Sequence, residues 1–255
     1  MSERVGEEQM EPQFARRAHA VRPQAGMTLI ELAVVLAIIS IVIGGAAFSL
    51  RDWSTSLRAR DGARDMADIL QLGRAESIRT GTPHVAFFAF DTLGAPLMGE
   101  DGVTQVWAVL ISDDDGDLLI DAGELRYTVP LPPAGANLTF GRAAGRTLIP
   151  RNVGARMGDP FWNTGVEGTA EETNSPANFR HPNDPNDVQN WVVFAPDGTP
   201  RSARPDGMGG TVLGAIGSGD GAIYVTNGDR EYAVVIAPLG GIRMFQWDAN
   251  GAQWR

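Results

Sequence analysis

The most apolar part of the chain is an uncharged run near its N-terminus. Residues 32–50 read LAVVLAIISIVIGGAAFSL, nineteen residues without Asp, Glu, Lys or Arg. A helix rises about 1.5 Å per residue, so a run of this length nearly matches a hydrocarbon core about 30 Å thick. The pattern therefore predicts a transmembrane helix over 27–50, with a single acid, Glu31, near its start.

The segment that follows the apolar run has the pattern of an amphipathic helix. Proline is absent from 24–82, and large apolar residues recur at helical spacing between charged ones. These apolar positions are Trp53, Leu57, Met66, Ile69 and Leu70. Gly81 and Pro83 are stop signals, so the amphipathic half of one long helix is predicted to span 51–80. Glycine lowers helix stability, so the glycines of this helix are predicted to be points where it bends or frays. They are Gly44, Gly45, Gly62 and Gly73.

The remainder of the chain, 81–255, has the pattern of a β-rich head. Short runs of β-branched and aromatic residues alternate with turns of Gly, Pro, Asn and Asp. The predicted strands are 84–90, 104–112, 124–130, 137–142, 190–196, 222–227, 231–237 and 242–248. Asn227 and Gly228 predict a hairpin because both residue types accept the positive φ angles of a tight turn. Strands without intervening helices form antiparallel sheets, so the fold class is α+β, with the long helix packed on an antiparallel β-sheet head.

Residues 143–189 interrupt the strand pattern. They are rich in Asn, Pro, Gly and acids and have little periodicity. A segment of this length and composition predicts a surface insertion in the head. It is either an interaction loop or a disordered loop.

Composition excludes some function classes. The formal net charge is −10 and the pI is about 4.8, which argues against a general nucleic-acid binder because such proteins need a basic surface. Only a local patch of Arg residues would still allow the protein to bind nucleic acid. The chain has no cysteine, so disulfides and Cys-based zinc or thiol chemistry are excluded.

Three interpretations fit the apolar run. An ordinary secretory signal has an apolar region of about 7–15 residues before a small-residue cleavage site, and GGAA at 44–47 has that composition, but the run is too long. A plain membrane anchor fits the length and leaves Glu31 unexplained. The third interpretation is a prepilin signal, which is cut on the cytoplasmic side, before the apolar run.

The residues around Gly26 favour the prepilin signal. Gly26, Met27 and then TLIE at 28–31 match a motif of a Gly, a hydrophobic residue and TLIE, so the N-terminal region resembles the type IV pilin and type II secretion pseudopilin superfamily. The resemblance implies that a prepilin peptidase removes the leader, 1–26, and that the new amine of Met27 is methylated. Glycine before the cleaved bond lets an extended backbone approach the catalytic carboxylates without a Cβ in the way. The family usually has Phe at the first mature position, so Met27 is a departure from its pattern.

Glu31 becomes the fifth residue of the mature chain under this interpretation. A carboxylate inside a bilayer costs about 2.5–3.5 kcal/mol on insertion scales and therefore needs a partner. The resemblance implies that Glu31 pairs with the N-terminal ammonium of a neighbouring subunit during filament assembly. The alternative is a Glu that reaches the membrane interface with its side chain.

Four further segments narrow the resemblance to the pseudopilin H and FimT family of minor subunits. They are 72–87, 107–129, 192–203 and 233–245. This family implies a pilin-like fold and a bacterial inner-membrane protein with a single pass and its C-terminal head in the periplasm. Its implied partners are other pilins or pseudopilins, the prepilin peptidase and the inner-membrane assembly platform, with no nucleic acid among them.

The resemblance predicts a minor subunit of a type II secretion pseudopilus that acts in protein secretion through filament assembly. The first alternative is a FimT-like minor pilin of a type IV pilus, with a role in DNA uptake. The second is a membrane-anchored periplasmic binding domain without a filament role. An enzyme is not expected: the mature chain has only His84 and His181, and it lacks a Gly-x-Ser-x-Gly elbow and a phosphate loop.

An acidic turn between two predicted strands has the spacing of a calcium loop. With Asp113 at position 1, acids fall at positions 3, 5, 9 and 12. The candidate ligands are Asp113, Asp115, Asp117, Asp121 and Glu124. Two features oppose calcium: Leu118 occupies position 6, where the EF-hand needs Gly for a sharp turn, and strands rather than helices flank the loop. The sequence therefore favours a solvated acidic turn with no cofactor, and calcium remains the alternative.

Overall fold

The computed structural model describes residues 27–121, 123–133, 137–141, 177–180, 188–248, 250 and 253–255. The predicted leader, including Gly26, and most of the predicted insertion lie outside the described residues. So do the side chains of 46–52, Thr55, Arg180, Val188 and Gln253. The chain divides into two units, Met1–Phe48 and Ser49–Arg255.

The N-terminal helix is α1, Leu29–Thr80, with 52 residues. It ends where the sequence predicts: Gly81 has φ +73° and donates its N–H to the carbonyl oxygen of Ser77 at 3.0 Å. A left-handed glycine is a common helix terminator because it has no Cβ to clash. Within the described residues, no helix has both the length and the apolar character needed to cross a membrane.

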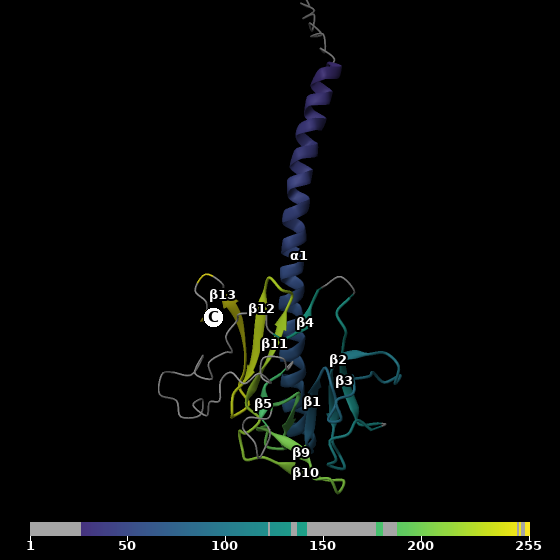
Figure 1. Ribbon diagram of the computed structural model, residues 1–255, viewed down its shortest axis with the longest axis vertical. Helices are drawn as coiled ribbons and strands as arrows, with labels where there is room; N and C mark the ends of the chain where they lie inside the picture. Colours follow the sequence, from purple (N-terminus) through teal and green to yellow (C-terminus); the bar gives the residue numbers. More distant parts are fainter. Residues whose placement is uncertain are drawn as a thin grey trace, which may run out of the picture. The chain divides into compact units, whose positions relative to one another are not determined.

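The second unit contains two five-stranded sheets in which every pairing is antiparallel (Figure 1). The first sheet has the order β3-β2-β1-β7-β8. Its strands are β1 His84–Phe88, β2 Val106–Ser112, β3 Leu125–Pro130, β7 Trp191–Phe194 and β8 Pro200–Arg201. The second sheet has the order β14-β13-β12-β11-β4. Its strands are β4 Thr139–Phe140, β11 Gly221–Thr226, β12 Glu231–Ile236, β13 Ile242–Asp248 and β14 Gln253–Trp254.

Two short strand pairs complete the described β structure. They join β9 Ala203–Pro205 to β10 Thr211–Leu213, and β5 Phe179–Arg180 to β6 Val188–Gln189. An α+β fold with an antiparallel β-rich C-terminal part is therefore confirmed. All eight predicted strands are present. The unpredicted strands β5, β6, β8, β9, β10 and β14 have two or three residues each, too few to produce an alternating pattern.

The hairpin between β11 and β12 is also present, but its geometry differs from the prediction. The loop has four residues, and Asn227 donates its N–H to the carbonyl oxygen of Arg230 at 3.1 Å. Gly228 has φ +90°, whereas Asn227 does not have a positive φ. Asn227 instead accepts the N–H groups of Asp229 and Arg230 on its Oδ1, so its side chain organises the loop.

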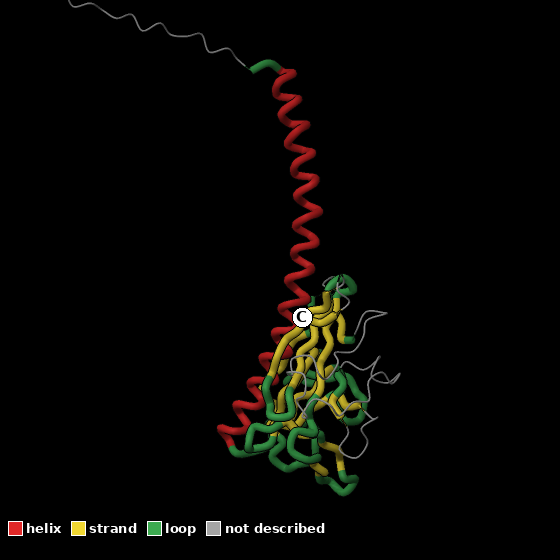
Figure 2. The backbone as a smooth tube through the Cα atoms, turned by 90° about the vertical axis from the view of Figure 1, so that its left-hand side faces the viewer, coloured by secondary structure: helices red, strands yellow, loops and turns green. Residues whose placement is uncertain are grey.

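The main core lies where α1 meets both sheets of the second unit, and Figure 2 shows this part of the helix along one side of the strands. The buried helix positions are Ala59, Ala63, Met66, Ile69 and Leu70. Val85 and Phe87 pack in a second cluster on the opposite face of the first sheet, while Ala86 and Phe88 face the helix. The first sheet is therefore buried on both faces, which explains the unbroken apolar run in β1.

Small residues let the helix approach the sheets closely, which corrects the prediction for Gly62 and Gly73. A Cβ at Gly73 would lie 2.9 Å from Leu110 Cδ1, and one at Gly62 would lie 2.6 Å from Leu138 Cδ2. These glycines are close-packing positions within a continuous helix. The predicted apolar face was wrong at Trp53 and Leu57, which are 63% and 37% exposed, whereas it was right at Met66, Ile69 and Leu70, which are buried.

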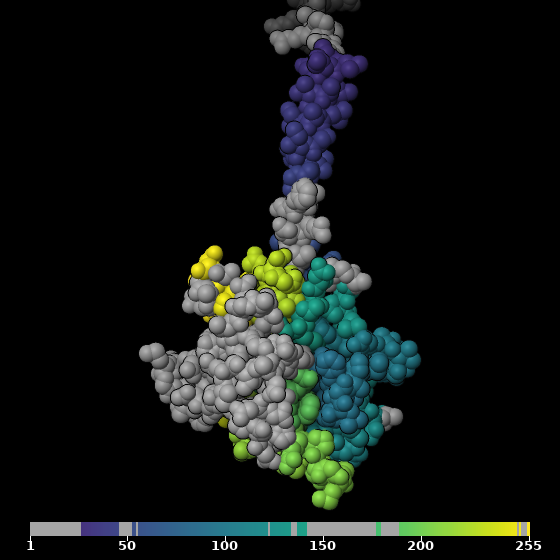
Figure 3. All heavy atoms as spheres, viewed as in Figure 1, coloured from purple at the N-terminus to yellow at the C-terminus, as the bar shows by residue number. Residues whose placement is uncertain are grey.

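The C-terminal end of the predicted insertion belongs to the core. Ala177 forms a β-bridge with Ile223, and Phe179 is fully buried in the main cluster. Asn178 accepts the N–H of Ala222 on its Oδ1 at 2.5 Å. A surface loop is therefore the wrong description for 177–179. Figure 3 shows the segments around β2 and β3, coloured blue to teal, as part of the described surface.

Candidate functional site

The first candidate site is the N-terminus of α1, where Thr28 and Glu31 form a reciprocal cap. Glu31 Oε2 accepts the N–H of Thr28 at 3.1 Å and its hydroxyl at 3.2 Å, and Thr28 Oγ1 accepts the N–H of Glu31 at 3.3 Å. This is a capping box, which satisfies backbone N–H groups that a helix start leaves without intrahelical partners. The Thr-x-x-Glu spacing is visible in the sequence, but no capping role was predicted for Thr28.

The side chains that follow this cap are exposed. All described side chains of 27–45 are exposed, and they include eleven large apolar ones from Leu29 to Ile43 together with Met27. The hydroxyl of Ser40 donates to the carbonyl oxygen of Leu36 at 2.8 Å, so this polar group is satisfied within the helix. An apolar surface of this extent marks an interaction with lipid or with protein.

The N-terminal region matches the family model of the prokaryotic N-terminal methylation motif over residues 21–47. This match supports a type IV pilin-like protein. It suggests a structural subunit that is processed by a prepilin peptidase and assembles with other pilins. No curated protein and no solved structure matches the chain.

A pilin-like N-terminus gives the residues of this site distinct predicted roles. Gly26 and Met27 flank the predicted cleavage point, and Met27 is 68% exposed. Glu31 lies beside the N–H of Thr28, one residue from the amine that cleavage would create. The local cap bonds one oxygen of its carboxylate, Oε2, and the side chain remains exposed next to an apolar surface.

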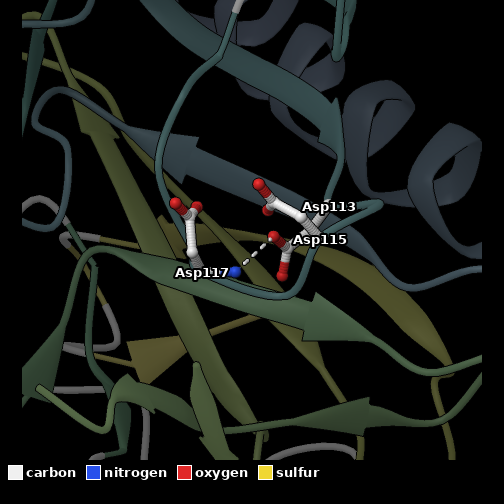
Figure 4. A group of neighbouring side chains, drawn as sticks. All are labelled: Asp113, Asp115 and Asp117. Carbon is white, nitrogen blue, oxygen red and sulfur yellow. Dashed lines mark hydrogen bonds between the residues drawn. The ribbon is translucent and has the colours of Figure 1, made fainter. Parts of the chain in front are cut away.

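The second candidate site is the acidic loop 113–124, which joins β2 to β3. The three carboxylates of Asp113, Asp115 and Asp117 each offer an oxygen within 4.8 Å of the other two (Figure 4). Asp113 is 3% exposed, and its Oδ1 accepts the N–H groups of Asp117 at 3.1 Å and Leu118 at 3.2 Å. Burial raises the pKa of Asp113, and the two N–H bonds oppose that shift.

Leu118 has the left-handed backbone conformation that glycine was expected to provide at position 6 of the loop. Its φ is +60°, in the left-handed region that non-glycine residues adopt rarely, and its side chain is fully buried in the cluster beneath the first sheet. Burial of this side chain offsets the strain of the backbone. The prediction that a leucine at this position prevents the sharp turn is therefore wrong.

Glu124 closes the loop at its C-terminal end. Its carbonyl oxygen accepts the N–H of Ser112 at 2.9 Å, and its Oε1 accepts the N–H of Asp114 at 3.0 Å. Glu124 is 8% exposed, and its Oε2 is buried without a hydrogen-bond partner among the described residues. Burial raises the pKa of Glu124, and repulsion from Asp115 and Asp113 contributes to the same direction.

The predicted ligand set is thus only partly assembled. Asp113, Asp115 and Asp117 come together, whereas Glu124 and Asp121 are outside this group. Glu124 is buried with its Oε1 on the N–H of Asp114, and Asp121 is exposed. The described ion pair of this loop joins Arg126 to Asp114 at 3.7 Å, and Asp114 is not a predicted ligand.

A groove of about 530 Å³ on the second unit was not predicted from the sequence. Arg60, Arg230 and Arg255 line it together with Trp53. These residues come from α1, the hairpin after β11 and the C-terminus, so no local sequence pattern marks them.

Proposed function

We propose that the protein is a minor pseudopilin, of the pseudopilin H type, in the pseudopilus of a type II secretion system. Its function is assembly into the filament during protein secretion, and no catalytic step is assigned to it. In this proposal 27–50 is the transmembrane and assembly segment, and the head lies in the periplasm of a bacterium. The proposed partners are other pseudopilins, the prepilin peptidase and the inner-membrane assembly platform.

The observation that carries this proposal is the methylation motif at 21–47, followed by a capped helix with an exposed apolar surface. Backbone groups inside a helix are satisfied, and the hydroxyl of Ser40 is satisfied too, so this surface is compatible with lipid or with a bundle of apolar helices. The four sequence segments that resemble pseudopilin H and FimT narrow the proposal to that family.

Glu31 is the proposed assembly residue. The capping box bonds Oε2 of Glu31, but it leaves a net negative charge at the edge of an apolar surface. The methylated ammonium of Met27 in a neighbouring subunit is the proposed partner, because such a pair removes both charges as the subunit enters the filament. A plain anchor offers no such partner.

Two substitutions separate the assembly role of Glu31 from its capping role. Glu31→Gln removes the charge, while Gln is also used at this position of a capping box. Thr28→Ala removes the capping hydroxyl and retains the carboxylate. Three properties are measured in the bacterium. Intact mass reports processing, crosslinking to other pseudopilins reports incorporation, and the third readout is secretion.

We expect Glu31→Gln to be processed but not incorporated, and Thr28→Ala to be incorporated. Equal defects in the two variants would indicate that Glu31 only caps the helix. Normal incorporation of Glu31→Gln would overturn the assembly role of the Glu31 charge. The absence of crosslinks between the wild-type chain and other pseudopilins would overturn the filament role and favour the membrane-anchored binding domain.

The groove at Arg60, Arg230 and Arg255 keeps the FimT-like alternative under consideration, because a basic groove beside an exposed Trp can contact a nucleic-acid strand. The net charge of −10 opposes this function. Salt-dependent binding of single-stranded DNA that Arg60→Ala together with Arg230→Ala abolishes would support a pilus subunit with a role in DNA uptake.

A further inference from the structure

We propose that the loop between β2 and β3 is a calcium site in which Asp113, Asp115 and Asp117 bind the ion and the buried carboxylate of Glu124 completes the charge of the site. The proposal concerns the head alone and does not depend on the assembly role of the N-terminus. It reverses the expectation of a solvated acidic turn.

The positions of the three aspartates fit one ion. Calcium binds oxygen at about 2.3–2.6 Å, so two oxygens on the same ion are at most about 5 Å apart. Asp113, Asp115 and Asp117 each provide an oxygen within 4.8 Å of the others (Figure 4). A cluster of acids does not define a site by itself, so further observations are needed.

The buried carboxylate of Glu124 is an independent indication of a missing partner. Leaving one oxygen of a carboxylate buried and unpaired costs free energy, so native structures rarely keep such an atom without an ion, a water or a donor. Glu124 Oε2 is in this position, and the N–H of Asp114 holds the same carboxylate against the acidic loop. The N–H that Glu124 accepts belongs to the residue between Asp113 and Asp115, so its carboxylate lies against the backbone of the acidic loop. A divalent cation among these groups would remove the repulsion and satisfy the free oxygen.

The backbone of the loop is preorganised for binding. The carbonyl oxygen of Glu124 accepts the N–H of Ser112, so the β2–β3 ladder fixes both ends of the twelve-residue segment 113–124. The ladder therefore performs the role that the flanking helices perform in an EF-hand. Within the loop, the positive φ of Leu118 supplies the sharp turn at position 6, and Asp113 accepts the N–H groups of Asp117 and Leu118.

The first experiment measures thermal unfolding of the full chain in detergent micelles, in EGTA and in 5 mM calcium. Sites of this kind on extracellular proteins have dissociation constants of about 10⁻⁴–10⁻³ M. By mass action, 5 mM calcium should then raise the melting temperature of a domain of about 200 residues by about 2–9 °C. Magnesium at the same concentration should give a smaller rise.

Three variants test the ligands. Asp115→Asn together with Asp117→Asn should abolish the rise, and the fold should persist because Asp115 is exposed and Asp117 is only half-buried. Glu124→Gln should reduce the rise strongly while leaving the melting temperature in EGTA unchanged or higher, because it removes a buried charge. Asp229→Asn, an exposed acid in the hairpin of the other sheet, is the matched control and should keep the full rise.

Titration calorimetry of the wild-type chain should give one calcium per chain, and this result does not require any variant to fold. The absence of both heat and thermal shift at 5 mM calcium would overturn the proposal. A rise of equal size in Asp115→Asn/Asp117→Asn would also overturn it, and an equal rise with magnesium would overturn the assignment to calcium.

Discussion

Replacing Leu118 by glycine has two opposite effects on the stability of the head: it relieves backbone strain, and it removes a buried side chain. Leu118 has φ +60° and a fully buried side chain. Glycine would relieve about 1–2 kcal/mol of left-handed strain. Removing a buried leucine side chain costs about 2–5 kcal/mol, and the added freedom of the unfolded chain costs about 0.5–1 kcal/mol more. Burial therefore dominates, and Leu118→Gly should destabilise the head by about 3 kcal/mol.

For a unit of about 200 residues, this loss corresponds to a fall in melting temperature of about 6–12 °C. The assay is thermal unfolding in EGTA, followed by near-ultraviolet circular dichroism. Leu93→Gly is the control, because Leu93 is a loop leucine that is 79% exposed, and it should cost no more than about 1 kcal/mol. An unchanged or higher melting temperature for Leu118→Gly would refute the reasoning and show that backbone strain outweighs burial in this loop.

Three further predictions concern the head and its helix. Gly73→Leu should destabilise the head by about 1–3 kcal/mol despite the better helix propensity of leucine. Gly45→Leu should not destabilise it, because a Cβ at Gly45 meets nothing within 4 Å. Thermal unfolding of both variants tests this. Asp65→Asn should raise the melting temperature slightly at neutral pH. Partial burial, with repulsion from neighbouring acids, raises the pKa of Asp65, so its ionised form opposes folding. The gain in melting temperature should vanish as the pH falls below about 4, because the carboxyl group of the wild type is then protonated. Removing 1–50 should leave a soluble, β-rich domain by circular dichroism, and an insoluble or mainly helical product would contradict the described core.

The strands were predictable because their cause is local. Runs such as VAFF in β1 and YVT in β11 place β-branched and aromatic side chains between turn residues, and each formed a strand as expected. The end of α1 was predictable for the same reason, since Gly81 is a local terminator. The burial of Gly62 was not predictable, because it depends on Leu138 and Trp107, which are distant in the sequence.

The candidate sites were likewise predictable where their cause is local and not predictable where it depends on tertiary packing. The motif around Gly26 and Glu31 lies within six residues, and the match to the methylation motif over 21–47 supports the prediction of a pilin-like protein. The conformation of Leu118 depends on a hydrophobic cluster formed by distant strands, which a rule about glycine at one loop position does not include. The burial of Glu124 has a similar tertiary origin, so the acidic spacing alone was insufficient to favour calcium.

Intact-mass analysis of the protein extracted from bacterial membranes tests the central proposal most directly. The account predicts a mature chain that begins at Met27, lacks 1–26 and carries one added methyl group. The uncleaved chain, or a chain that begins near Phe48 as ordinary signal peptidase would produce, would contradict it.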